Sequence, residues 1–192
     1  MKKRISLVDI AHQLVGARLY PGAVAVDATV GNGYDTLFLL QKVAPAGRVY
    51  GFDIQQLALE SVQDRMANPD FRDCLTLFHR SHAEMDEMLP QAQHGLVSAV
   101  MFNLGYLPGG DKSVITRAES TLAALSAASR LLSPEGIITI VAYPGHVGGA
   151  QECEQVRQWC ARLDSGRFEF ELIEAKPDDR AAPRLFAVNR KF

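Results

Sequence analysis

Apolar residues recur along this chain in two alternating patterns. In the first they lie three and four residues apart, which predicts helices over 7–15, 34–43, 55–66, 116–132 and 148–163. In the second they form short continuous runs, which predict strands over 23–26, 48–53, 75–78, 97–102 and 137–141. Two further β-rich segments, 168–173 and 185–189, have no helix between them, so we expect an antiparallel pair at the end of the sheet.

Strands that are continuously apolar, rather than alternating, are typical of parallel strands covered on both faces. The sequence therefore predicts an α/β fold with a doubly wound, mostly parallel sheet. Hydroxyl and carboxylate residues three apart predict capping boxes that open two helices, at Ser6 with Asp9 and at Thr116 with Glu119. In such sheets ligands bind at the carboxyl ends of the strands, so candidate chemistry is expected in the loops that follow them.

Composition indicates one folded domain over residues 1–192. The chain is 47% hydrophobic and 22% charged, which is the balance of a soluble globular protein. Its net charge of -2 excludes a wholly basic protein that coats nucleic acid, while leaving room for a local basic patch. The three cysteines form no CxxC motif, which argues against a disulfide framework and a structural zinc site, and we expect no metal.

The chain shows no membrane signal. Its longest apolar runs, such as 136–142, fall well short of the ~20 residues that cross a bilayer. The basic start is followed by a segment that Asp9, His12 and Arg18 interrupt, so it is no signal peptide. We expect a cytoplasmic protein.

The loop after the first strand is rich in glycine and runs from Asp27 to Thr36. Gly31 and Gly33 allow a tight turn and a close approach of the backbone to a ligand. A GxGxxG dinucleotide motif needs a third glycine where Thr36 stands, and the GxxxxGK[ST] phosphate loop is absent. A nicotinamide cofactor is therefore disfavoured.

Acidic residues near this loop favour a cationic ligand. Asp27 closes the first strand and Asp35 opens the following helix, where their charge would repel a pyrophosphate and attract an ammonium or a sulfonium. Asp53, at the end of the second strand, is placed to accept hydrogen bonds from ribose hydroxyls. Together they predict S-adenosylmethionine (SAM) rather than NAD.

The loop after the fourth strand contains Asn103-x-x-Tyr106, the spacing of the [D/N]PPY loop of methyltransferases that modify nitrogen. The Asn103 carbonyl can accept a hydrogen bond from an acceptor N–H and aim its lone pair, and the Tyr106 ring can pack on a base. An amine acceptor must also lose a proton, for which Asp111, His146 and water remain alternatives.

Histidines give a weaker signal. Ser81 and His82 follow the third strand, where an adenine edge would lie, and a packing or surface role is the alternative. His79 and His82 lack a third ligand at a recognisable spacing, so a zinc site is disfavoured. His12 and His94 are interpreted as surface or packing residues.

A family resemblance is carried by Ser81-His82 and four strings: DATVGNGYDT, VYGFDIQ, FNLGYLPGGDK and VAYPGHVGG. They resemble the small class I SAM-dependent methyltransferases labelled rRNA methylases, some of which act on tRNA. The resemblance implies a Rossmann-like, seven-stranded sheet with an antiparallel last strand. It also implies methyl transfer to the aminomethyl group of 5-aminomethyl-2-thiouridine at the wobble position of the tRNA anticodon. The implied cofactor contacts are Asn32, Asp35, Asp53, Gln55, Ser81 and His82, with Asp27 supporting, beside the Gly31 and Gly33 of the loop itself, and the implied acceptor loop is 103–112.

Alternative functions stay open: rRNA methylation, methylation of a small amine, and a non-catalytic SAM-binding module. An RNA substrate requires cations near the acceptor loop, and the candidates are Lys112, Arg117, Arg180 and Arg184, with 2–4 as a further basic segment. A homodimer is a further alternative, by analogy with small domains that need a partner surface to hold RNA.

Overall fold

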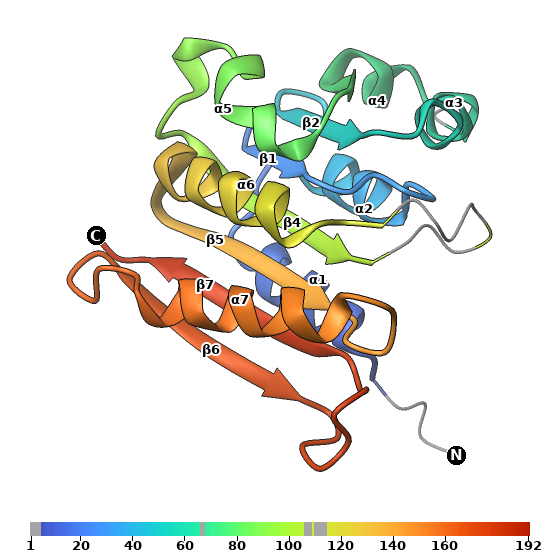
Figure 1. Cartoon of the computed structure of the whole chain (residues 1–192). Helices are drawn as coiled ribbons and strands as arrows, with labels where there is room; N and C mark the ends of the chain where they lie inside the picture. The colour runs from blue at the N-terminus through green and yellow to red at the C-terminus, as the bar shows by residue number, and fades with distance from the viewer. Residues whose placement is uncertain (1–4, 66–67, 106–108, 110–114) are drawn as a thin grey trace.

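The structure, a computed structural model, describes residues 5–65, 68–105, 109 and 115–192. Within these ranges a seven-stranded sheet carries helices on both faces, in the order β3-β2-β1-β4-β5-β7-β6 (Figure 1). The strands are β1 (Val24–Asp27), β2 (Arg48–Asp53), β3 (Leu75–His79), β4 (Val97–Leu104), β5 (Leu132–Ala142), β6 (Phe168–Glu174) and β7 (Arg184–Arg190).

Helices α1, α2, α3 and α4 pack on one face of the sheet, and α5, α6 and α7 on the other. Their bounds are α1 (Leu7–Gly16), α2 (Tyr34–Val43), α3 (Gln56–Arg65), α4 (Pro69–Cys74), α5 (Met85–Met88), α6 (Ala118–Leu131) and α7 (Gly149–Ala161). Two 3₁₀ turns, η1 (His82–Glu84) and η2 (Gln91–Gln93), flank α5. Within the described ranges, no helix combines the length and apolarity needed to cross a membrane.

The pairing of the strands confirms the predicted fold class. β1 is parallel to β2 and β4, and the parallel pairing continues outward to β3 and β5. β7 is antiparallel to both of its neighbours, β5 and β6, and is inserted between them. The sheet is therefore mostly parallel with an antiparallel last strand, and the β6–β7 pair lies at its end as expected.

Strand β4 shows why the central strands consist of continuous apolar runs. Val100 and Phe102 are buried in the cluster under α6 and α7, whereas Ala99 and Met101 are buried in the cluster under α1 and α2. Successive side chains of a strand point to opposite faces, so a strand covered on both faces needs apolar residues at every position.

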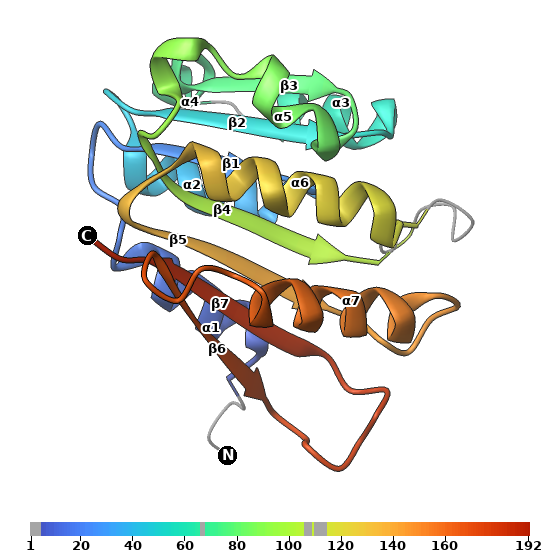
Figure 2. The same cartoon turned by 60° about the vertical axis from the view of Figure 1, so that its left-hand side comes forward.

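The order of the strands decides where a ligand can bind. From β1 the chain moves outward to β2 and β3, then returns to the other side of β1 with β4. The arrows of β3, β2 and β4 end on the same side of the molecule (Figure 2). The crevice between the loops after β1 and β4 is the position that doubly wound sheets use for ligands.

Some local predictions were wrong. The capping box at Ser6 and Asp9 is present, but that at Thr116 and Glu119 is not. Helix α6 begins one residue later than a Thr116 cap requires, because the Thr116 hydroxyl donates instead to the carboxylate of Glu152, 2.8 Å away. Helices α4 and α5 and both 3₁₀ turns were not predicted, because elements this short contain too few apolar positions to show a period.

Gly33 supports a test of the packing between the first loop and α3. It caps α2 with a left-handed φ of 76°, and a Cβ there would lie 2.4 Å from Cγ2 of Val62. Gly95 has a nearly equal φ of 77° and open space around it. We expect Gly33→Ala to lower the free energy of unfolding by about 2–4 kcal/mol and Gly95→Ala by about 1 kcal/mol, measured in urea. A second substitution, Val62→Ala, should restore part of the loss in Gly33→Ala, and equal losses in the two single variants would contradict the close contact.

Candidate active site

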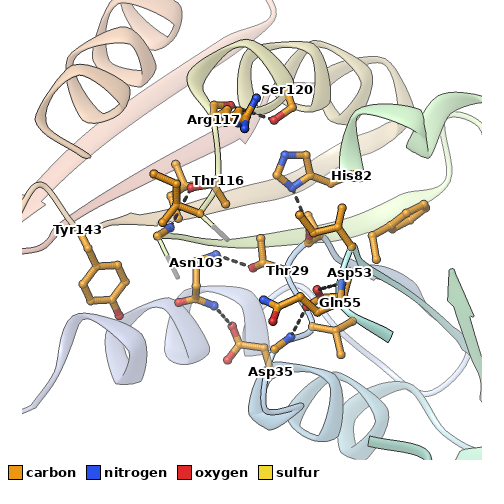
Figure 3. A pocket seen from close by; sticks show the side chains of 18 of the residues that line it. Thr29, Asp35, Asp53, Gln55, His82, Asn103, Thr116, Arg117, Ser120 and Tyr143 are labelled. Atoms are coloured by element: carbon orange, nitrogen blue, oxygen red, sulfur yellow. Dashed lines mark hydrogen bonds between the residues drawn. The ribbon is translucent and has the colours of Figure 1, made fainter. Parts of the chain in front are cut away.

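A cavity of about 1010 Å³ opens at the carboxyl ends of β1, β2 and β4. Residues from α1 and from the loop after β5 complete its wall, and Figure 3 shows the labelled side chains converging on it. It brings together most of the residues predicted from the sequence: Gly31, Asn32, Asp35, Asp53, Gln55, Ser81, His82, Asn103 and His146. Asp27 and Gly33 do not line it, and Tyr106 and Asp111 lie outside the described residues.

Asp53 joins the loops after β1 and β2. Its Oδ2 accepts a hydrogen bond from the Gly31 amide and its Oδ1 one from the Gln55 amide, each at 2.8 Å. Gly31 has a positive φ of 50°, the conformation that aims its N–H at the carboxylate. Because a carboxylate offers about four lone-pair directions, Asp53 keeps acceptor capacity for hydroxyl groups in the cavity.

Asp27 lies beneath the loop and is fully buried. Its carboxyl group accepts hydrogen bonds from the Thr36 hydroxyl at 2.6 Å and from the Thr29 amide at 3.2 Å. Burial, with a further contribution from the charge of Asp35, raises the pKa of Asp27 to about 7. Asp27 therefore ties the loop to α2, and Asp35 and Asp53 are the acidic residues that face the cavity.

Asn103 is held on two sides at the end of β4. Its backbone N–H donates to the Thr29 hydroxyl at 2.8 Å, and its side-chain Nδ2 donates to Asp35 Oδ2 at 2.6 Å (Figure 3). An ionised carboxylate only accepts, so the amide must turn its nitrogen toward Asp35. The Asn103 carbonyl oxygen is thereby left for a donor in the cavity.

His82 lies at the opposite end of the cavity from Asn103 (Figure 3). Its Nδ1 donates to the Ala28 carbonyl at 3.1 Å, and its ring meets Phe102 edge-on with centroids 5.7 Å apart. Burial lowers the pKa of His82, so the ring is neutral and its Nε2 is an acceptor. His79 contacts a different carbonyl, that of Ile54, at 3.0 Å, so the two histidines hold separate segments.

Half-buried Thr116, buried Thr121 and buried Glu152 form a hydrogen-bond cluster beside the described ends of the acceptor loop. The Thr116 hydroxyl accepts a hydrogen bond from the Gly105 amide at 2.9 Å and donates to Glu152. Glu152, on α7, also accepts from the Thr121 hydroxyl at 2.7 Å. Gly105 is therefore joined to Thr116, and Thr116 is joined to α7.

Several site residues were missed by sequence reasoning: His12, Thr29, Thr116, Tyr143 and Glu152. Thr29 had a usable signal, because it lies in the glycine-rich loop. Tyr143 also had a signal, because it follows the predicted fifth strand, and Thr116 was assigned to a helix cap. His12 and Glu152 lie on helices and reach the site only through the fold.

The candidate cations for RNA are placed differently from one another. Arg117 lines the cavity, and so does Arg80, which was not predicted. Arg184 instead donates to Glu174 at 2.6 Å, in a pair that joins β7 to β6. Lys112 and the segment 2–4 lie outside the described residues.

The order of the strands, the antiparallel β7 and a cavity at the ends of β1, β2 and β4 define the fold of class I SAM-dependent methyltransferases. A family model described as "Putative rRNA methylase" matches residues 49–189, and the chain belongs to that family. A solved structure from Clostridium thermocellum, described as a "putative rRNA-methylase", is 37% identical, with a TM-score of 0.90 and coverage of 99% of this chain and 100% of that one. A methyltransferase from Streptococcus mutans, solved in complex with SAH, is 28% identical, with a TM-score of 0.84 and coverage of 99% of both chains.

Relatives of known name extend the comparison. The chloroplastic tRNA (mnm5s2U34)-methyltransferase of Arabidopsis thaliana is 42% identical over 168 residues, which are 83% of this chain and 61% of that protein. The ribosomal RNA small subunit methyltransferase H of Desulfotalea psychrophila is 32% identical over 87 residues, which are 45% of this chain and 29% of that protein. The chain thus spans less than two thirds of either relative. The family resemblance and fold predicted from the sequence are confirmed.

The raised pKa of Asp27 makes stability depend on pH. The folded state keeps the Asp27 proton up to about pH 7, whereas an aspartate exposed to water ordinarily has a pKa of 3.8. The stability that this proton contributes is therefore fully present below about pH 4 and is lost as the pH rises through 7. We expect the free energy of unfolding of the wild type, relative to Asp27→Asn, to fall by roughly 2–3 kcal/mol between pH 5 and pH 8.

Urea denaturation at the two pH values measures this difference, and Asp70→Asn, at an exposed position on α4, is the control. A difference between wild type and Asp27→Asn that stays constant with pH would show that Asp27 is ionised throughout.

Proposed function

We propose that residues 1–192 act as one SAM-dependent N-methyltransferase domain whose acceptor is RNA. The proposed acceptor group is the aminomethyl group of 5-aminomethyl-2-thiouridine at the wobble position, so the partner is the anticodon region of tRNA. The observation that carries this assignment is the 42% identity to the Arabidopsis tRNA (mnm5s2U34)-methyltransferase over most of this chain. From the sequence we add a cytoplasmic location and a homodimer as the unit that holds the RNA.

The described residues fit SAM as the cofactor. The cavity volume of about 1010 Å³ accommodates an adenosyl group and a second, acceptor group. Asp53 keeps lone pairs for the ribose hydroxyls, and the carboxylate of Asp35 faces the part of the cavity where a sulfonium and an ammonium would be stabilised. His82, neutral and with an acceptor Nε2, lies where the adenine edge is expected.

When bound, SAM supplies an activated methyl group. Asn103 supplies the orientation: its carbonyl oxygen accepts a hydrogen bond from the acceptor N–H and directs the nitrogen lone pair into the cavity. A lysine-like amine must first lose a proton, at a cost of about 4–5 kcal/mol at pH 7. His146, which lines the cavity, Asp111 and water are the proposed proton acceptors.

Arginines at the cavity support RNA as the substrate. Arg80 and Arg117 both line the cavity and are both exposed, so their guanidinium groups can reach phosphates beside the acceptor nucleotide. Arg184, engaged by Glu174, is left out of this surface.

The ribose assignment is tested by Asp53→Asn. We expect its affinity for SAH to fall roughly tenfold or more, because the variant loses a charge-assisted acceptor and one of its two amide contacts. Isothermal titration calorimetry measures the affinity. Glu171→Gln, which removes the same charge from an exposed position on β6, is the matched control. Unchanged affinity in Asp53→Asn would contradict the assignment.

The acceptor is tested with tRNA from cells that lack the gene, incubated with the purified protein and SAM. Nucleoside mass spectrometry should find one added methyl group on the wobble nucleoside. Asn103→Ala should bind SAH normally while turnover falls about 100-fold, because its role is to position the acceptor.

Other outcomes separate the alternatives. Methylation of rRNA and not tRNA would favour the activity named for the Desulfotalea relative. No methylation of either RNA, with SAH binding intact, would favour a small amine substrate or a binding module.

A further inference from the structure

His12 on α1 does not line the cavity but contacts Asp35, which does. Its Nε2 lies 2.6 Å from Asp35 Oδ1, and we take this nitrogen as the donor because a carboxylate oxygen accepts. The imidazole also stacks on the ring of Phe38, with centroids 4.0 Å apart and planes 3° from parallel. The ring therefore makes two separable contacts, a stack and a hydrogen bond.

The hydrogen bond continues into the cavity through Asp35. One carboxylate oxygen of Asp35 accepts from His12, and the other accepts from Asn103 Nδ2 at 2.6 Å. The three residues come from α1, α2 and β4 and form one chain of hydrogen bonds. His12 is at its outer end, with a side chain that is 25% exposed, and Asp35, 6% exposed, is its centre.

Such a chain can hold the catalytic amide in one orientation. With one oxygen anchored by His12, the carboxylate plane of Asp35 cannot turn about its terminal bond. Its other oxygen then stays directed at Asn103 Nδ2. Without the His12 donor, the carboxylate is free to rotate, and the Asn103 amide loses the fixed partner that keeps its oxygen toward the acceptor.

We propose that His12 is a positioning residue for methyl transfer, acting through Asp35 on the amide of Asn103. This proposal rests on the proposed function, since it assumes that Asn103 orients an acceptor nitrogen. It gives α1, which precedes the glycine-rich loop and every strand of the sheet, an indirect part in the reaction.

Two substitutions separate the two contacts of the ring. His12→Phe keeps a ring that can stack on Phe38 and removes the donor, whereas His12→Gln removes the ring and keeps an N–H donor at a similar reach. Gln13→Phe, which places the same ring at the neighbouring exposed position of α1, is the control.

We expect kcat to fall about tenfold in His12→Phe, the scale of one lost hydrogen bond to a charged group. KM for RNA and the affinity for SAH should change by less than about threefold, because His12→Phe leaves the carboxylate of Asp35 in the cavity wall. His12→Gln should recover most of the lost kcat. In an Asn103→Ala background, His12→Phe should cause no further loss, because the two residues act as one unit.

Three results would overturn the proposal. The first is a wild-type kcat in His12→Phe, and the second is a larger loss of kcat in His12→Gln than in His12→Phe. The third is an equal loss of kcat from His12→Phe in the wild-type and Asn103→Ala backgrounds. The second result would assign His12 to packing on Phe38 alone.

A measurement independent of turnover keeps this test apart from that of the proposed function. The side-chain amide resonances of Asn103 in the SAH-bound protein should shift in His12→Phe and return toward their wild-type positions in His12→Gln. If the wild type methylates no RNA but these shifts occur, the proposed acceptor is wrong and the positioning chain stands. If the Asn103 resonances do not move in His12→Phe, His12 does not position Asn103, whatever the substrate.

Discussion

The parallel pairing of β1 with both β2 and β4 is the constraint on which the site depends. Because the three strands run the same way, Asp27, Asp53 and Asn103 reach one edge of the sheet from segments far apart in the chain. Both faces of these strands are buried, so a shift of one residue in register would exchange the side chains that pack in the two cores and disrupt the packing of both. The buried residues of these strands thus fix the position of the polar residues at their carboxyl ends.

Three carboxyl groups at this edge have different roles because each has different surroundings. Asp27 is buried, with a raised pKa, and joins the loop to α2 through Thr36. Asp53 accepts one backbone amide on each oxygen and so couples the loops after β1 and β2. Asp35 accepts from the side chains of His12 and Asn103, which connects the cofactor side of the cavity to the acceptor side. Proximity alone would make like charges repel, and hydrogen bonding with burial is what lets them share the edge.

Predictions from sequence succeeded where the signal is local and failed where a distant partner intervenes. The box at Ser6 and Asp9 is present because both of its residues lie within the first turn of the same helix. Thr116 has the same pattern, yet its hydroxyl is taken by Glu152, 36 residues away in sequence. His12 likewise has no local signal of function, because its partner Asp35 is 23 residues further along the chain.

The sequence by itself determined the order of the strands and the longer helices, the class of fold and the set of polar residues at the strand ends, because periodicity and turn residues act over a few neighbours. It did not determine which of those polar groups face the ligand. Tertiary structure decided that Asp27 is covered while Asp35 and Asp53 line the cavity, and that Arg184 is paired while Arg117 lines the cavity. Burial and hydrogen-bond geometry depend on elements that meet only after the sheet is assembled, so no local pattern can encode them one residue at a time.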